Sequence, residues 1–296
     1  TATAGSDYAA AIGTVTFPAG VTTQTITIAV NGDTTYEYDE TFFVNLASVS
    51  GATIADAQGL GTIRNDAADV APTLDIISPA PVAEGTGGST FIHLEVTLSA
   101  ASGRPVTLKY ATAGGTATSG VDFAPASGTL VFAPGQTSQF IPVSIVTDAL
   151  NELDETFQVK LSKVVGAQSG LLAATGTITN DDALPSLSIA NASIFEGDSG
   201  FRKMVFTVTL SAASGQTVLV NYATAPNTAL TPADFITKTG TLTFAPGVTT
   251  QTLFILIRGD NTVEGDETFT VDLSVPTNAT IAPGFGTGIG TIQDDD

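Results

Sequence analysis

Acidic residues recur in this sequence at a spacing that suits cation binding. In three places an Asp is followed four residues later by a Glu: Asp33/Glu37, Asp148/Glu152 and Asp260/Glu264. In three others an alternating apolar stretch ends on acid, as TIRND, TITNDD and TIQDDD. Two carboxylates about 4 Å apart repel by roughly 4 kcal/mol at an effective dielectric of 20, so such clusters favour a neutralising cation. All-oxygen ligands without His or Cys suit a hard cation, and Ca²⁺, with its adaptable geometry, is favoured over Mg²⁺.

The acidic segments lie at matching places of an internal repeat. Gapless alignments start at Gly13, Gly128 and Gly240, and each is followed by a GTI strand that ends on acid. A repeat of about 113 residues has the size of one β-sandwich domain and not of a solenoid unit. We therefore expect three domains: 1–68, 69–182 and 183–296.

The apolar residues of each repeat alternate with Thr, and 30 Gly and 14 Pro punctuate the chain, which is typical of an all-β protein. In the third repeat we expect seven strands, near 186–191, 201–211, 217–224, 240–244, 250–258, 268–274 and 287–293. Seven short strands predict tandem immunoglobulin-like, antiparallel seven-stranded β-sandwiches without a helix of note. The first repeat begins after the third strand, so we expect only its last four.

This strand order brings most of the 29 acidic residues to one pole of each sandwich. If each strand crosses the sandwich once, that pole holds the first, third and fifth connections and the end of the last strand. The opposite turns carry no acid. In the first repeat the pole keeps four candidate calcium ligands: Asp7, Asp33, Glu37 and Asp66.

Acidic loops also have a simpler explanation, since Asp and Glu are common turn residues and solvating charges. That explanation accounts neither for the bias to one pole nor for the fixed Asp-to-Glu spacing. Within each cluster the glutamates of the DET sequence, Glu40, Glu155 and Glu267, begin a strand and either cap the loop or point away. Their Asp neighbours, Asp39, Asp154 and Asp266, are expected outside the coordination sphere.

These motifs together resemble the Calx-beta family. The resemblance rests on the AEG/FEG loop, the TATxGxDF stretch, the FxPGxTxQ turn, the DxxxE…DETF loop and the terminal GTIxxDD, and it covers nearly the whole chain. It implies a seven-stranded sandwich that binds calcium through its distal loops. The family occurs in sodium–calcium exchangers, in an integrin β subunit and in tandem arrays of large bacterial surface and secreted proteins. The low Lys content and abundant Thr and Ala of this chain resemble the bacterial arrays most.

The resemblance also implies a ligand set for each complete repeat. In the second repeat the ligands would be Glu84, Asp122, Asp148, Glu152, Asp181 and Asp182. In the third they would be Glu196, Asp234, Asp260, Glu264, Asp294 and Asp295. Asn65, Asn151 and Asn180 stand near places where the exchanger has more acid, which suggests fewer or weaker ions than in a cytosolic sensor.

Other functions find less support. The net charge of −20 argues against nucleic acid and anionic membrane as partners, and no apolar run is long enough to span a bilayer. Cysteine is absent, and the single histidine, His93, should face outward from its strand. The acidic pairs could imitate a glycosidase dyad, but their repetition fits metal binding better. We expect no catalytic residue and no organic cofactor.

Three functions remain open. The first is a calcium-dependent structural or adhesive array, secreted or on a bacterial cell surface, in which Ca²⁺ at the inter-domain poles stiffens a rod. The second is a subunit of an extracellular filament, in which strands of a neighbouring copy complete the first domain. The third is the calcium sensor of a transporter. The expected partners are therefore calcium ions, neighbouring repeats and possible other copies of the chain.

Overall fold

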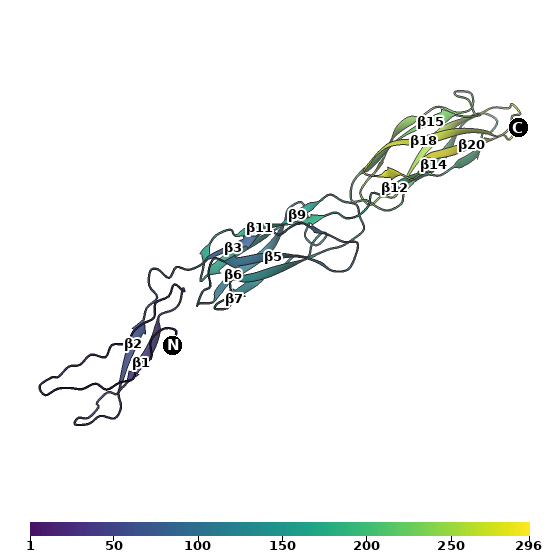
Figure 1. Ribbon diagram of the computed structural model, residues 1–296. Coiled ribbons are helices and arrows are strands. Elements are labelled where there is room, and N and C mark those ends of the chain that lie inside the picture. The colour runs from purple at the N-terminus through teal and green to yellow at the C-terminus, as the bar shows by residue number, and fades with distance from the viewer. The chain divides into compact units, whose positions relative to one another are not determined.

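The computed structural model describes all of residues 1–296 and contains β-strands but no helix (Figure 1). It divides into two compact units. One comprises Thr1–Ala80, Phe91–Ser144 and Thr156–Gly176, and the other comprises Pro81–Thr90, Ile145–Glu155 and Thr177–Asp296. The three domain boundaries expected from the sequence do not coincide with this division and stay a prediction. No helix is available to cross a membrane.

The third repeat forms two sheets that face each other. A four-stranded sheet has the order β17-β14-β12-β19, and a five-stranded sheet has the order β13-β20-β18-β15-β16. Their bounds are β12 Ser186–Ile189, β13 Ala192–Phe195, β14 Gly200–Leu210, β15 Val218–Pro226, β16 Thr239–Phe244, β17 Thr250–Gly259, β18 Glu267–Thr277, β19 Thr280–Ile281 and β20 Thr287–Gln293. All seven expected strands are present, which confirms the all-β fold class.

Period-two alternation explains how these strands pack. On β14 the side chains of Met204, Phe206, Val208 and Leu210 are all buried, as the alternation predicts, and the residues between them are more exposed. The sequence did not reveal that the first expected strand is split. β12 pairs with β14 in one sheet, whereas β13 pairs in parallel with β20 in the other. The chain therefore changes sheets between Ile189 and Ala192.

The second repeat has the same arrangement. Its sheets have the orders β10-β3-β5-β8 and β4-β11-β9-β6-β7. The bounds are β3 Thr73–Ile77, β4 Val82–Ala83, β5 Thr90–Leu98, β6 Val106–Gly114, β7 Ser127–Phe132, β8 Ser138–Ile145, β9 Glu155–Val165, β10 Gln168–Ser169 and β11 Ala173–Thr179. His93 lies on β5 and is exposed, as predicted.

In the first repeat the expectation of four strands is wrong. Only β1, Glu40–Asn45, and β2, Gln58–Ile63, are strands, and they pair antiparallel. The stretches 13–17 and 25–30, aligned with β16 and β17, are not strands. The physical reason lies in the topology: β16 pairs only with β15, and β17 pairs only with β14. Since the first repeat has no equivalent of β14 or β15, neither stretch has a strand to pair with. Ala29 and Val30 are joined only to Ala9 and Tyr8, through one backbone hydrogen bond and an isolated bridge.

Candidate metal centres

In the third repeat, loops and a strand end bring six acidic side chains close together in two groups. Glu196, just after β13, lies with Asp294 and Asp296, which follow β20. Asp234, Glu264 and Glu267 form the second group, and in each group the carboxylate oxygens lie within 4.8 Å of one another. Asp260 is close enough to raise the pKa of both Glu196 and Glu264. The site is therefore built entirely from oxygen donors.

Backbone amides orient several of these carboxylates. The N–H of Thr262 donates to Asp260 Oδ1 at 2.8 Å, which closes a local turn around the Asp260 side chain. The N–H of Leu230 donates to Asp234 Oδ2 at 2.6 Å. Across the pole, the N–H of Glu264 donates to Asp294 Oδ1 at 3.3 Å and the N–H of Gly197 donates to Asp295 Oδ1 at 2.8 Å. The loops and the strand end are thus tied together through the carboxylates.

The electrostatics of this pole are unfavourable without a cation. Burial and, after it, the neighbouring charges of Asp260, Glu264 and Asp294 together raise the pKa of Glu196 to about 7. Burial likewise raises the pKa of Glu267 to about 7, with a contribution from its hydrogen bond to Asp234. Because these glutamates lie beside other carboxylates, a bound cation would offset their mutual repulsion.

The second repeat has a matching group in which two oxygens have no partner. Glu84, Asp181 and Asp182 bring their carboxylate oxygens within 4.8 Å of one another. Glu84 is only 6% exposed, and burial followed by the charge of Asp148 raises its pKa to about 7. Glu84 Oε1 and Asp182 Oδ2 are both buried without a hydrogen-bond partner. Buried oxygens left unpaired are costly, and a hard cation would satisfy them.

Asp148 and Asp122, two further predicted ligands of the second repeat, accept backbone N–H groups as their counterparts in the third repeat do. Asp148 Oδ1 accepts the N–H of Leu150 at 2.8 Å, as Asp260 does with Thr262, and Asp122 Oδ2 accepts the N–H of Thr118 at 2.5 Å. In the repeat alignment Asp122, Glu152 and Glu155 correspond to Asp234, Glu264 and Glu267.

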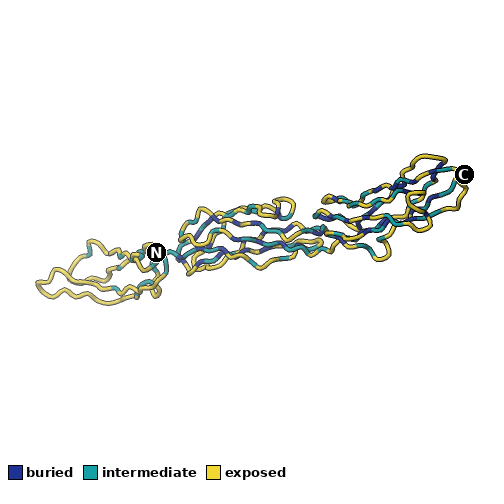
Figure 2. The backbone as a smooth tube through the Cα atoms, turned by 90° about the horizontal axis from the view of Figure 1, so that it is seen from above, coloured by how far each residue is buried: buried dark blue, intermediate teal, exposed yellow.

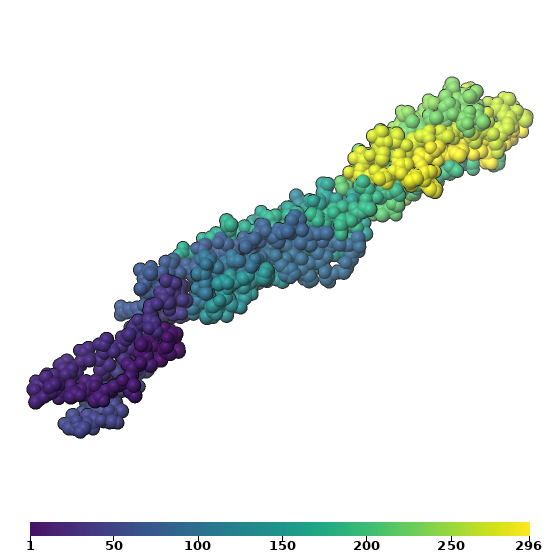
Figure 3. All heavy atoms as spheres, in the orientation of Figure 1, coloured from purple at the N-terminus to yellow at the C-terminus, as the bar shows by residue number.

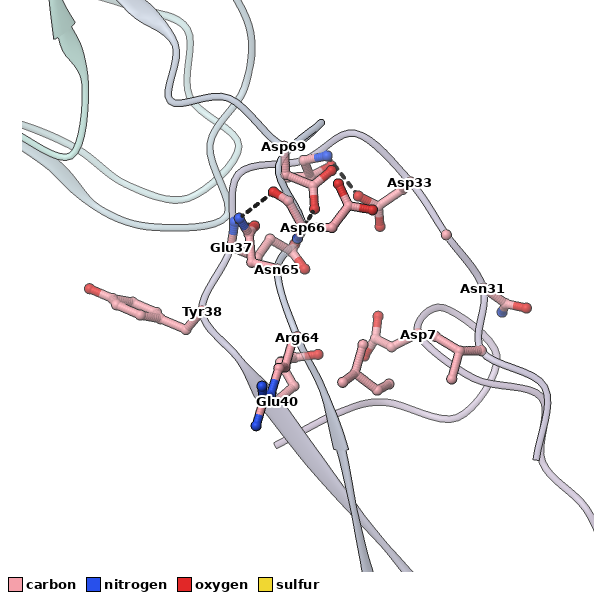
Figure 4. A pocket seen from close by; sticks show the side chains of 14 residues that line it. Asp7, Asn31, Asp33, Glu37, Tyr38, Glu40, Arg64, Asn65, Asp66 and Asp69 are labelled. Carbon is pink, nitrogen blue, oxygen red and sulfur yellow. Dashed lines mark hydrogen bonds between the residues drawn. The ribbon is translucent and has the colours of Figure 1, made fainter. Parts of the chain in front are cut away.

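In the first repeat all four predicted residues line one pocket. Asp7, Asp33, Glu37 and Asp66 surround it, together with residues that the sequence did not single out as ligands, among them Asp69. Figure 4 shows the carboxylates of Asp33, Asp66 and Asp69 pointing toward one another, and Tyr38 pointing away. Arg64 lines the same pocket, and its positive charge lowers the affinity of this place for a cation.

The asparagines have a structural role that the sequence did not reveal. Asn65 Oδ1 accepts the N–H of Glu37 at 2.8 Å, and Asn180 Oδ1 accepts the N–H of Glu152 at 2.8 Å. Asp294 holds the same position in the third repeat. The side-chain amide of Asn65 or Asn180 therefore accepts the same backbone hydrogen bond as Asp294 without adding a negative charge. This explains why two of the three poles have an asparagine at this position.

Acidic residues beyond the predicted ligand set also join these places. Glu267 of the DET sequence lies inside a group, although its position at the start of β18 left its direction open. Asp296 lies with Glu196 and Asp294; aligning the strands on Gly176 and Gly290 matches it with Asp182 and could have found it. Asp69 lies in the segment after the first repeat, and no pattern pointed to it. Which residues bind an ion stays a prediction.

The poles of the first and second repeats also contact the following repeat through a short loop. In the first repeat the carbonyl of Tyr36, directly before Glu37, accepts the N–H of Gly103 at 3.1 Å. Arg104 stacks between the rings of Tyr36 and Tyr38, with its guanidinium carbon 4.3 and 4.1 Å from the ring centres. Its Nη1 donates to the Tyr36 hydroxyl at 3.0 Å, and its Nη2 donates to the carbonyl of Glu37.

The second repeat makes the same contact with the third through different side chains. The carbonyl of Asn151 accepts the N–H of Gly215 at 3.2 Å and the Ser214 hydroxyl at 3.2 Å. Gln216 stands where Arg104 stood, and its Nε2 donates to Asn151 Oδ1 at 3.1 Å. Val263 is the equivalent residue of the third repeat and is 76% exposed.

Glycine is required at both contacts. A Cβ on Gly103 would overlap the side chain of Glu37, and a Cβ on Gly215 would overlap that of Glu152. Neither glycine has a positive φ, so the requirement comes from space and not from backbone conformation. A predicted calcium ligand of one repeat therefore packs directly on the backbone of the next.

The chain is similar in sequence to parts of several known proteins. The chain is 27% identical over 284 residues to extracellular matrix protein 3 of Lytechinus variegatus, covering 86% of this chain and 9% of that protein. It is 31% identical over 192 residues to sodium/calcium exchanger 1 of Bos taurus, covering 58% of this chain and 20% of the exchanger. The chain thus spans only a small part of these relatives.

Similarity extends to a solved structure and to a family profile. A crystal structure of CBD12 from CALX1.2 shares 23% sequence identity, with a TM-score of 0.36 over 72% of this chain and 83% of that one. The profile of the Calx-beta domain matches residues 1–67, 78–183 and 180–296. Since these matches cover nearly the whole sequence, the chain belongs to the Calx-beta family.

Proposed function

We propose that this chain is a calcium-binding structural array of an extracellular or cell-surface protein, in which Ca²⁺ at the pole of each repeat fastens it to the next. The observation that carries the proposal is the pair of buried, unpartnered oxygens on Glu84 and Asp182, close to a loop that also contacts the third repeat. Membership of the Calx-beta family and the relation to an extracellular matrix protein support the same function.

Calcium would act on each pole in two ways. It would neutralise the repulsion among the carboxylates, and it would crosslink the loops that hold Glu84 and Asp148 to the end of β11. Because Asn151 and Glu152 lie on one of those loops, ordering the loop also orders the surface on which Gly215 packs. Calcium binding and contact between repeats would therefore reinforce each other.

The proposal assigns the chain no catalytic role. The acidic groups recur at the poles of successive repeats next to inter-repeat contacts, which suits a binding and mechanical function. A bacterial source, a filament and a transporter sensor remain predictions of the sequence, and the structural array is favoured because both described contacts join a predicted calcium loop to a neighbouring repeat.

Small-angle scattering tests this function. The full chain would be measured in calcium and in chelator, with magnesium as the control ion. We expect a longer maximum dimension and a narrower distribution of shapes in calcium alone. If the scattering curves are the same in calcium and chelator, the stiffening function is wrong, even where calcium still binds.

A further inference from the structure

Two poles of the chain hold the following repeat through the same backbone geometry. The carbonyl of Tyr36 accepts the N–H of Gly103 at 3.1 Å. The carbonyl of Asn151 accepts the N–H of Gly215 at 3.2 Å. In the space-filling view the first of these contacts lies where purple N-terminal atoms adjoin blue atoms of the second repeat (Figure 3). Because the two distances are nearly equal, the backbone does not distinguish one neighbour from the other.

The segments that dock on these poles, Ser102–Arg104 and Ser214–Gln216, also share one internal structure, and we call them the docking loops. Their serines are each 2% exposed, although most loop residues have the colour of exposed residues in Figure 2. In each loop the serine Oγ accepts the N–H of the third residue, at 3.0 and 3.1 Å. The serine carbonyl accepts a glycine N–H of its own repeat at 2.9 Å in both. The docking loops therefore differ only in the side chain of their third residue.

The first pole binds a planar cation. The guanidinium carbon of Arg104 lies 4.3 Å from the ring centre of Tyr36 and 4.1 Å from that of Tyr38. Its Nη1 also donates to the Tyr36 hydroxyl at 3.0 Å. A guanidinium stacks and forms hydrogen bonds at the same time, which neither an amide nor an ammonium group reproduces. The two tyrosines thus form a site for an arginine.

The second pole binds an uncharged amide. Gln216 Nε2 donates to Asn151 Oδ1 at 3.1 Å, and Asn151 Nδ2 donates to the carbonyl of Asp182 at 2.8 Å. Asn151 is only 6% exposed, so leaving its amide oxygen without a donor would be costly. Leu153, which aligns with Tyr38, is 70% exposed and offers no ring. This pole therefore suits a glutamine.

The third repeat has another combination at the same two positions. Val263 and Gly265 stand where the first repeat has Tyr36 and Tyr38, and Val263 is 76% exposed. Neither residue has a ring to stack on a guanidinium or a side-chain amide to pair with a glutamine. The three poles thus differ at the positions that meet the variable residue of a docking loop.

We propose that these side chains determine which repeat can follow which. The two residues that flank the pole glutamate select the third residue of the docking loop: Tyr36 and Tyr38 select arginine, and Asn151 with Leu153 selects glutamine. Because the backbone part of the contact is common, a mismatched loop loses only the side-chain interactions, and this difference in affinity is the specificity. The proposal depends on no bound ion, so it can fail while calcium-dependent stiffening holds, and the reverse.

A double-mutant cycle on the first contact tests the proposal, in the full chain and in chelator. The variants are Arg104→Gln, Tyr36→Asn with Tyr38→Leu, and all three changes together, which reproduce the residues of the second contact. The readout is hydrogen exchange of the Gly103 amide, which bonds across the contact. We expect either half of the change to speed this exchange at least about fivefold. The complete change should return it to within about twofold of the unmodified chain. If the two accelerations multiply instead, the proposal is overturned.

Arg104→Lys is the matched control for charge. It keeps the positive charge and removes the planar fork that stacks between Tyr36 and Tyr38. We expect the Gly103 amide to exchange at least about threefold faster. An unchanged rate would show that the acidic pole accepts any cation, and the proposal would then be wrong.

Gln216→Arg tests the second contact and covers the case in which the tyrosine variant does not fold. Since Asn151 and Leu153 offer no ring, we expect the Gly215 amide to exchange at least about fivefold faster. The amides of β18 should keep their rates, which shows that the third repeat stays folded. If arginine is accepted at position 216 without faster exchange, the second pole does not distinguish the loops and the proposal fails.

Discussion

The side chain of Glu152 lies against Gly215 of the following repeat, in space that any Cβ at that position would fill. The same relationship joins Glu37 to Gly103. A residue of the calcium-binding pattern is thus also part of a contact between repeats. The first two predictions follow from this arrangement.

The change Gly215→Ala should weaken calcium binding by the second repeat. Overpacking costs about 1–3 kcal/mol, and a Cβ there has to displace Glu152. We expect calcium affinity to fall by about tenfold, equivalent to 1.4 kcal/mol, in calorimetric titration. Gly13→Ala is the control, because its Cβ would meet open space. Equal affinities for the two variants would show that the contact does not constrain the glutamate.

The change Arg104→Gln should loosen the contact between the first and second repeats. Gln stands at the equivalent position 216, but it cannot stack between Tyr36 and Tyr38 as Arg104 does. Loss of the two cation–π contacts should cost about 1–2 kcal/mol and speed exchange of the Gly103 amide. Lys109→Gln removes the same charge from an exposed position and should leave that amide unchanged. A matching effect in Lys109→Gln would attribute the result to net charge.

The change Glu196→Gln should have opposite effects with and without calcium. Without calcium it removes a buried carboxylate whose pKa is raised to about 7, so the melting temperature should rise. With calcium it removes a ligand, so the stabilisation by calcium should shrink. Asp56→Asn, at a loop outside the poles, is the control for net charge. A fall in melting temperature without calcium would contradict the repulsion argument.

The pH dependence of stability should also reverse with calcium. Glu84 and Glu196 have folded-state pKa values of about 7, raised above their ordinary 4.5. Their protonated forms therefore stabilise the fold at pH below about 4.5, and this contribution is lost as the pH rises through about 7. In calcium-free buffer we expect a lower melting temperature at pH 8 than at pH 5.5. In saturating calcium the order should invert, because protons compete with the ion.

The strands of the complete repeats could be predicted from period-two alternation and turn residues alone. The fate of residues 13–30 could not, because a strand forms only when its pairing partner is present. The local pattern predicts a strand at Gly13–Phe17. That stretch is not a strand, because the first repeat has no counterpart of β15, with which the aligned β16 pairs. The exchange of sheets between Ile189 and Ala192 was missed for the same reason, since it depends on which neighbour pairs.

The acidic poles could be predicted in outline from the strand order. Glu84 and Glu196 lie at the places where the sequence puts them, each with two acids at the end of the last strand. The repeat alignment alone could not show that Asn151 and Gly215 form a contact between repeats, because their partners lie far apart in sequence. Such contacts need three-dimensional placement.

Calorimetric titration of the chain with calcium, together with thermal melts, tests the central claim most directly. We predict heat of binding and a rise in melting temperature that grows with calcium, since an ion at 1,000 times its dissociation constant adds about 4 kcal/mol per site. Glu84→Gln and Glu196→Gln together should abolish most of that rise. No heat and an unchanged melting temperature at several millimolar calcium would contradict the account.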